Sequence, residues 1–156
     1  TANNGQGWPK YALRSVYRTA DGGVAVGAFT PTRVRVAPGT VLLVNSDYPF
    51  SDRVEVLLSQ PEAKQADTAL LGLHVRIPGW ATAASVLHDG VPVPSVQPGE
   101  MLSLPCTAPL CNATLLLNPE IRLESWFNSS VSVLRGPLLF SLDIGAKFVD
   151  YGVCED

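Results

Sequence analysis

Proline and glycine interrupt this chain at short and nearly even intervals. Thirteen residues of each type are spread along 156 positions, and few of the windows between them are long enough for a helix. The main exception lies near the start, where Pro9 suits the first turn of a helix. The sequence therefore predicts an all-β protein, preceded over residues 1–14 by a short helical or irregular lead-in.

From Ser15 onward, apolar and polar residues alternate with the period of two that half-buried strands show. In Arg53–Leu58, for example, charged and apolar residues take turns, and the residues of Asp21-Gly22-Gly23 are typical of a tight turn. About ten such runs predict an antiparallel β-sandwich over residues 15–144. Gly136-Pro137 is expected to bend the chain between the two sheets. Residues 145–156 are expected to form a final strand or a tail.

Charge and hydropathy exclude several classes of partner. The formal net charge is −3, and the 11 basic residues occur singly, so no basic stripe exists that would neutralise a row of phosphates. The longest apolar runs, such as residues 41–44 and 114–117, are strand-sized and fall far short of the ~18 residues that a membrane span needs. We therefore expect neither a nucleic acid nor a membrane as a partner.

Two residue patterns predict a secreted, extracellular protein. Asn112-Ala113-Thr114 and Asn128-Ser129-Ser130 match the acceptor pattern for N-glycosylation. Cys106 and Cys111 enclose four residues, a loop that a disulfide can close. Cys154 is then left over, either free or paired with a cysteine of another chain or segment.

The first residues carry no leader sequence. Thr1-Ala2-Asn3-Asn4-Gly5 is polar and lacks the apolar stretch of a signal peptide. We therefore expect a mature or internal piece of a longer precursor.

Histidines and cysteines do not form a recognisable catalytic or metal-binding set. His74 alternates with core positions on a predicted strand, and His88 stands beside the turn Asp89-Gly90. The two histidines lack the spacing of metal ligands, and Cys106 and Cys111 suit a disulfide better than zinc. We assign no catalytic, cofactor-binding or metal-binding residue.

Glycoside hydrolysis usually requires two carboxylates on either side of the scissile bond. Asp47 and Asp52 bracket the aromatic segment Tyr48-Pro49-Phe50, but aspartates that cap a turn are the favoured interpretation. The carboxylates considered for such a pair are Asp47, Asp52, Glu55, Glu120 and Glu124. The sequence shows no nucleophile elbow, phosphate loop or dinucleotide fingerprint.

Tryptophans provide candidate contacts for a sugar, because sugars stack on flat aromatic faces. Trp80 follows Pro78-Gly79, and Trp126 precedes Phe127-Asn128, so both are expected near sheet edges. A packing role is the favoured interpretation for both, and sugar contact is the alternative.

Several segments resemble the β-rich region of glycoside hydrolase family 127, which includes the β-L-arabinofuranosidases. The most specific is Leu73-His74-Val75-Arg76-Ile77-Pro78-Gly79-Trp80-Ala81, a strand followed by a turn. The others are Asp21–Val26, Asp47–Phe50, Val86–Gly90, Pro98–Glu100 and Val131–Leu142. Their order and spacing agree with the family over roughly Tyr17 to Leu142, nearly the whole chain.

This resemblance implies that the catalytic residues lie elsewhere. In the family, an α/α-barrel precedes the sandwich and carries a zinc-bound cysteine nucleophile together with a glutamate. The barrel's adjacent cysteine pair would fall just before Thr1, and residues 8–13 would be the tail of its last helix. None of these ligands matches a residue here, so zinc is expected only in that barrel. The segment 106–111 also departs from the family, which usually has R-x-W-x-x-G-D there.

The resemblance favours a non-catalytic, ancillary sandwich domain of a secreted glycoside hydrolase, with an upstream barrel as its partner. Two alternatives remain open. One is a secreted structural or self-assembly module of a filament or cell surface, whose partners are identical subunits. The other is a carbohydrate-binding module that uses Trp80 or Trp126. We expect no catalytic activity from this chain alone.

Overall fold

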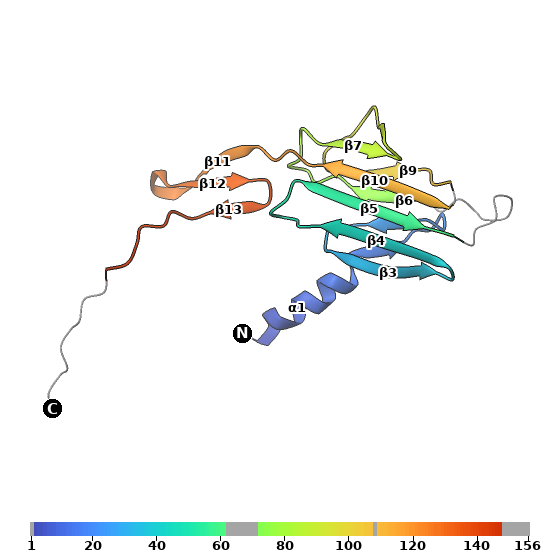
Figure 1. The fold of residues 1–156 in the computed structure, drawn as a ribbon. Coiled ribbons are helices and arrows are strands. Elements are labelled where there is room, and N and C mark those ends of the chain that lie inside the picture. Colours follow the sequence, from blue (N-terminus) through green and yellow to red (C-terminus); the bar gives the residue numbers. More distant parts are fainter. Residues whose placement is uncertain (1, 62–71, 108, 148–156) are drawn as a thin grey trace.

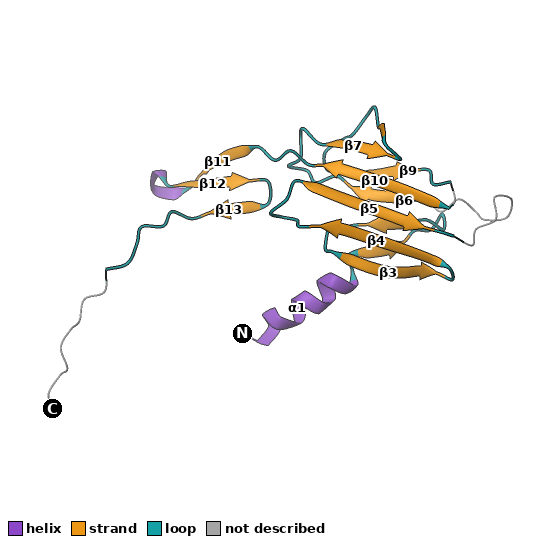
Figure 2. Ribbon diagram, in the orientation of Figure 1, coloured by secondary structure: helices purple, strands orange, loops and turns teal. Residues whose placement is uncertain are grey.

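The computed structural model describes residues 2–61, 72–107 and 109–147 and consists mostly of β-strands (Figures 1 and 2). One helix, α1 (Ala2–Leu13), leads into the first strand, which confirms the helical lead-in. Pro9 lies inside this helix rather than in its first turn, so the helix lacks the hydrogen bond that a backbone N–H would donate there. No helix in the described ranges is both long and apolar enough to cross a membrane.

Two sheets form the sandwich, as the alternation predicted. The first sheet has the strand order β1-β2-β6-β9, with β1 (Val16–Arg18), β2 (Val24–Val26), β6 (Leu73–Arg76) and β9 (Met101–Leu104). The second has the order β3-β4-β5-β10-β7-β8, with β3 (Thr32–Ala37), β4 (Thr40–Ser46), β5 (Arg53–Ser59), β7 (Ser85–His88), β8 (Val91–Pro92) and β10 (Leu110–Leu116). The pairing is antiparallel except between β2 and β6, which run parallel.

A third sheet was not predicted as a separate unit. It has the order β11-β12-β13, with β11 (Ile121–Ser125), β12 (Val131–Arg135) and β13 (Leu138–Phe140), and a short 3₁₀ turn, η1 (Phe127–Ser129), joins its first two strands. Figure 1 shows this sheet extending to one side of the sandwich, the same side from which α1 projects.

The core lies between the two sandwich sheets and follows from alternation. In β5, Val54, Val56 and Leu58 are buried while their neighbours are partly or fully exposed. Leu73 and Val75 of β6 face them from the other sheet, together with Ile77 just beyond that strand, all fully buried. Burial of a Leu or Ile side chain stabilises the fold by about 1.5–3 kcal/mol, so these positions hold the sandwich together.

The chain does bend at Gly136-Pro137, but the prediction that it crosses between sheets there is wrong. The two residues form a tight hairpin, because Arg135 pairs with Leu138 across β12 and β13 of the same sheet. Gly136 has φ +56°, a left-handed conformation that glycine adopts without strain. The chain therefore reverses within the third sheet instead of crossing between sheets.

Some predictions concern residues outside the described ranges. They are most of the polar loop over 60–67, Leu71 at the start of its predicted strand, residues 148–156 of the tail and Cys154. Residues 145–147, which are described, form no strand.

Candidate functional site

An aromatic cleft lies where the first sheet meets the end of α1. It has a volume of about 170 Å³ and is lined by Tyr11, Phe29, Tyr48, Arg76 and Trp80 together with Gly27, Ala28, Pro78 and Gly79. Burial raises the pKa of the Tyr48 hydroxyl, and the Tyr48 ring meets Phe29 edge to face at 5.5 Å between centroids. None of the described residues that line this cleft is a carboxylate, so the cleft offers stacking and hydrogen bonding rather than acid–base chemistry.

Trp80 also packs against the third sheet. A Cβ at Gly136 would lie 3.1 Å from Cζ3 of the indole, so the glycine backbone rests directly against the ring. A second pocket of about 210 Å³ on this side is lined by Trp80, Thr82, Glu120, Arg122, Gly79 and Gly136. Trp80 is therefore a packing residue on one side, with open pockets beside it.

Three of the carboxylates considered for catalysis are paired with arginines. Asp52 Oδ2 accepts a hydrogen bond of 2.7 Å from Arg135. Glu124 lies 3.5 Å from Arg122. Both carboxylates are therefore held in ion pairs with arginines of the third sheet.

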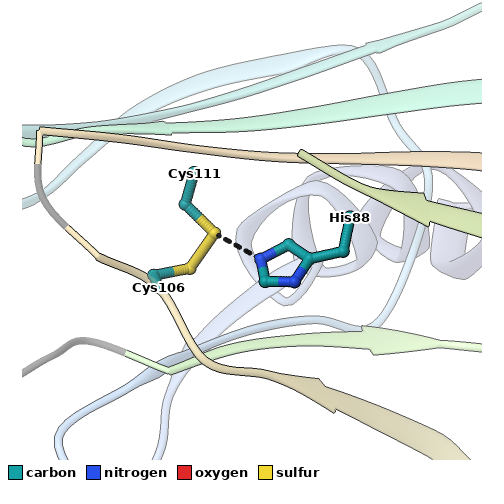
Figure 3. Close-up of side chains that lie close together, drawn as sticks. All are labelled: His88, Cys106 and Cys111. Atoms are coloured by element: carbon teal, nitrogen blue, oxygen red, sulfur yellow. Dashed lines mark hydrogen bonds between the residues drawn. A yellow bond between two sulfur atoms is a disulfide. The ribbon is translucent and has the colours of Figure 1, made fainter. Parts of the chain in front are cut away.

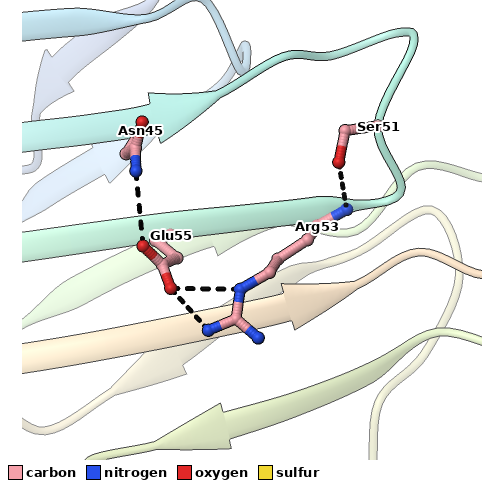
Figure 4. Close-up of polar contacts among 4 residues, drawn as sticks. All are labelled: Asn45, Ser51, Arg53 and Glu55. Carbon is pink, nitrogen blue, oxygen red and sulfur yellow. Dashed lines mark hydrogen bonds and ion pairs between the residues drawn. The ribbon is translucent and has the colours of Figure 1, made fainter.

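Glu55 is the third carboxylate that is paired with an arginine (Figure 4). Arg53 Nε donates to Glu55 Oε1 at 3.0 Å, and Asn45 Nδ2 donates to Oε2 at 3.4 Å. These contacts, the hydrogen bond from Arg53 above all, lower the pKa of Glu55. Asp47 lines the same shallow, polar surface pocket as Glu55, which is open to solvent.

His74 lies beside the first hairpin. Its Nε2 is 3.1 Å from Asp21 Oδ2, and Asp21 also accepts hydrogen bonds from the Thr19 hydroxyl and the Gly23 backbone. The Thr19 bond is the largest cause that lowers the pKa of Asp21. The contact between Asp21 and His74 holds the β1–β2 turn against β6.

Cys106 and Cys111 form a disulfide, with 5.3 Å between their Cα atoms (Figure 3). Both are fully buried, and His88 Nε2 lies 3.6 Å from the sulfur of Cys111. The family's zinc chemistry requires thiolate ligands, and sulfurs bonded to each other do not supply them. These three residues therefore do not fit a zinc ion in this state.

The two glycosylation patterns lie in different surroundings. Asn112 is half-buried within β10, which is paired on both sides with β5 and β7. Asn128 is exposed in the turn between β11 and β12, close to the exposed Trp126.

A family model described as the middle domain of GH127 β-L-arabinofuranosidases matches residues 23–107. The chain belongs to the GH127 family. The match spans β2 to β9 and reaches the first cysteine of the disulfide, so it includes strands of both sandwich sheets, while β1 and β10 lie outside it.

Solved structures of glycoside hydrolases, two of them described as GH127 enzymes, have the same fold. One is a glycoside hydrolase, with a TM-score of 0.62 at 20% identity over 78% of this chain and 21% of that one. Another is a GH127 β-L-arabinofuranosidase from Geobacillus stearothermophilus T6, with a TM-score of 0.62 at 17% identity over 83% of this chain and 21% of that one. A third, a GH127 β-arabinofuranosidase, gives 0.56 at 17% identity over 75% of this chain and 22% of that one. This chain spans about a fifth of their length, and the comparison with curated proteins gave no match.

Sequence reasoning missed one surface of this GH127 domain, the apolar face of the third sheet. Alternation and register place Ser125, Arg135 and Leu138 on one face with five further residues, all apolar: Ile121 and Leu123 of β11, Val131 and Val133 of β12 and Phe140 of β13. All five are exposed in this chain. The opposite face carries Arg122, Glu124, Trp126, Ser130, Ser132, Leu134 and Leu139. The alternation at 121–125 and 131–133 is visible in the sequence, but nothing there indicates that the apolar side lies open.

Proposed function

We propose that this chain is a non-catalytic, secreted domain of a larger GH127 glycoside hydrolase, and that it supports a catalytic barrel. Membership of the middle-domain family and the small share of the related enzymes that the chain spans both support this proposal. Because those enzymes include β-L-arabinofuranosidases, the whole protein is proposed to act on a glycoside of that class.

The observation that carries the proposal is the open apolar face of the third sheet. Leu123 is 68% and Ile121 73% exposed, although they lie side by side on one face with Val133. A contiguous apolar patch of this kind marks a surface that another part of the protein covers. We propose that the barrel of the same enzyme covers it.

Helix α1 gives a second surface of the same kind. Trp8 is 71% and Leu13 82% exposed, which is unusual for large apolar side chains on a short helix. The helix and the third sheet extend from the same side of the sandwich in Figure 1. Both surfaces are therefore placed to contact one neighbouring domain.

The polar chemistry of the described residues agrees with a supporting role. An arginine forms an ion pair with each of three carboxylates, Asp52, Glu55 and Glu124. Such ion pairs orient surface strands rather than transfer protons. In this proposal, the carboxylate and zinc chemistry of the family belongs to the barrel.

The secreted location is proposed from the disulfide and the two acceptor patterns. A buried disulfide persists in oxidising compartments and is rare in the cytosol. The exposed Asn128 gives a place where a glycan is accommodated on the folded domain.

A matched pair of substitutions in the natural full-length enzyme tests the supporting role. Leu123 and Leu139 are equally exposed here, at 68%, but lie on opposite faces of the third sheet. Leu123→Asn should lower the unfolding free energy of the full enzyme by about 1.5–3 kcal/mol, the value of a buried leucine, while Leu139→Asn should have little effect. Equal effects of the two substitutions would refute the proposed contact.

Self-assembly is the main alternative, because the same apolar face would also suit a second copy of the chain. This alternative requires that the natural protein oligomerise through the third sheet. Light scattering across a concentration series tests it. Self-assembly would be favoured if the natural polypeptide contains no barrel, forms oligomers, and the Leu123→Asn variant is monomeric.

Carbohydrate binding is a second alternative, favoured by the cleft between Tyr48, Arg76 and Trp80. Trp80→Ala also removes packing against Gly136, so Tyr11→Ala is the sharper variant, since Tyr11 lines the cleft and is half exposed. Binding on a glycan array that both substitutions abolish would favour this function.

A further inference from the structure

The hairpin that carries Asn128 has an unusual combination of groups. Trp126 N–H donates to the Ser130 carbonyl at 2.8 Å, and Ser130 N–H donates to the Phe127 carbonyl at 3.2 Å. Trp126 and Ser130 are thus paired across the hairpin, and paired residues of antiparallel strands have their side chains on the same face. Asn128 lies at the tip between them, in a left-handed conformation with φ 55° that asparagine tolerates.

We propose that Asn128, rather than Asn112, is the N-glycan acceptor of this protein, and that the first sugar of the glycan stacks on the indole of Trp126. The inference rests on the proposed secreted location. It gives Trp126 a role that the sandwich does not explain, because the side chain is 58% exposed and lies with Glu124 and Ser132 on the face opposite Leu123.

The transfer reaction uses a lipid-pyrophosphate-linked oligosaccharide as its donor. The side-chain nitrogen of Asn128 forms a bond to the anomeric carbon of the donor's first sugar. The bond from that carbon to the pyrophosphate oxygen breaks, and the pyrophosphate leaves with the electron pair. The proton lost by the amide passes to a base of the transferase. The hydroxyl residue of this acceptor pattern is Ser130, which is exposed.

Asn112 offers a much poorer place for a glycan. It lies in β10, and its backbone N–H donates to Asp89 Oδ1 at 2.7 Å. Thr114, the hydroxyl residue of this second pattern, is only 7% exposed. A glycan here would be attached to a central strand, β10, which is paired on both edges, at the residue next to the buried Cys111.

The stacking is argued from the pairing of Trp126 with Ser130, which puts the indole on the same face as the hydroxyl residue of the acceptor pattern, two residues from Asn128. An aromatic ring presents an apolar, electron-rich surface on which the C–H groups of a sugar pack. Phe127, the next residue, is also aromatic and is 88% exposed. Because it lies in the turn and is not paired with Ser130, it provides a matched control for Trp126.

Mass spectrometry of glycopeptides tests the acceptor. The full chain is secreted from a eukaryotic host together with a reporter of known glycosylation. We expect the glycan on Asn128, its loss in Ser130→Ala and in Asn128→Gln, its retention in Ser130→Thr, and no change in Thr114→Ala. A bare Asn128 beside a glycosylated reporter would overturn the proposal, as would an occupancy of Asn112 equal to or above that of Asn128. Because the host supplies the secretory route, either result leaves the proposed natural location untouched.

Hydrogen exchange tests the stacking. We expect the glycan to slow exchange of the β11 and β12 amides by about two- to tenfold, the factor that one aromatic contact supplies. The slowing should persist in Phe127→Ala and vanish in Trp126→Ala. Slowing that survives Trp126→Ala, or no slowing in the unmodified sequence, would refute the stacking.

Discussion

Gly136 joins the third sheet to the sandwich, and the substitution Gly136→Ala tests that joint. The residue is buried, has φ +56°, and would place a Cβ 2.9 Å from Pro119 Cβ and 3.1 Å from Trp80 Cζ3. A non-glycine residue in the left-handed region costs about 1–2 kcal/mol, and overpacking of a filled site costs about 1–3 kcal/mol. We therefore expect Gly136→Ala to lower the unfolding free energy by about 2–5 kcal/mol, measured by urea denaturation.

Gly90→Ala is the matched control for this prediction. Gly90 has φ +82°, but a Cβ there would meet no atom within 4 Å. Its substitution should cost only the backbone part, about 1–2 kcal/mol. If the two variants lose the same stability, Gly136 does not pack against Trp80 and the proposed joint is wrong.

Three further predictions concern covalent and charged contacts. Replacing both Cys106 and Cys111 by alanine should lower the unfolding free energy by about 2 kcal/mol, the loop-closure value for so short a loop, and an unchanged urea midpoint would contradict it. Arg135→Ala should cost at most about 1 kcal/mol, since the pair with Asp52 is about one-third exposed; a cost that does not shrink with added salt would contradict this explanation. The pKa of Glu55 in the folded state lies below its ordinary value of 4.5, so its stabilisation is present above pH 4.5 and is lost as the pH falls through the lower folded value. Glu55→Gln should therefore flatten the acid side of a plot of Tm against pH, and an unchanged slope would show that this ion pair contributes nothing.

Local pattern predicted most of the strands and their inward faces. In β5 the alternation of Arg53, Val54, Glu55 and Val56 specifies which side is buried, because successive side chains of a strand point to opposite faces. The turn at Asp21-Gly22-Gly23 and the hairpin around it followed from residue types alone. The resemblance to family 127 rested on the same segments, and the family match confirms it.

Non-local pairing was beyond the reach of this pattern. The parallel pairing of β2 with β6 joins Val24 to Leu73 across a long separation, and alternation does not determine which strand lies beside which. The hairpin at Gly136-Pro137 was misjudged for the same reason, since a Gly-Pro pair is compatible with a bend between sheets and with a reversal inside one. Alternation also places Leu123 and Val133 on one face without indicating what covers them.

The roles of single side chains depended on contacts that the sequence does not show. Packing was favoured for Trp80, and the structure adds its partner, Gly136. Arg53 and Glu55 share a face of one strand, so that ion pair is visible in the alternation. The partner of Asp52, Arg135, is distant in the sequence and appears only in three dimensions.

The hydrolysis of an aryl β-L-arabinofuranoside tests the central claim most directly. It is measured with the purified 156-residue chain and with the natural GH127 polypeptide that contains it. We predict turnover by the longer polypeptide and none above background by the chain alone. Sustained turnover by the 156-residue chain, lost on unfolding it, would contradict the claim that this sandwich leaves catalysis to another domain.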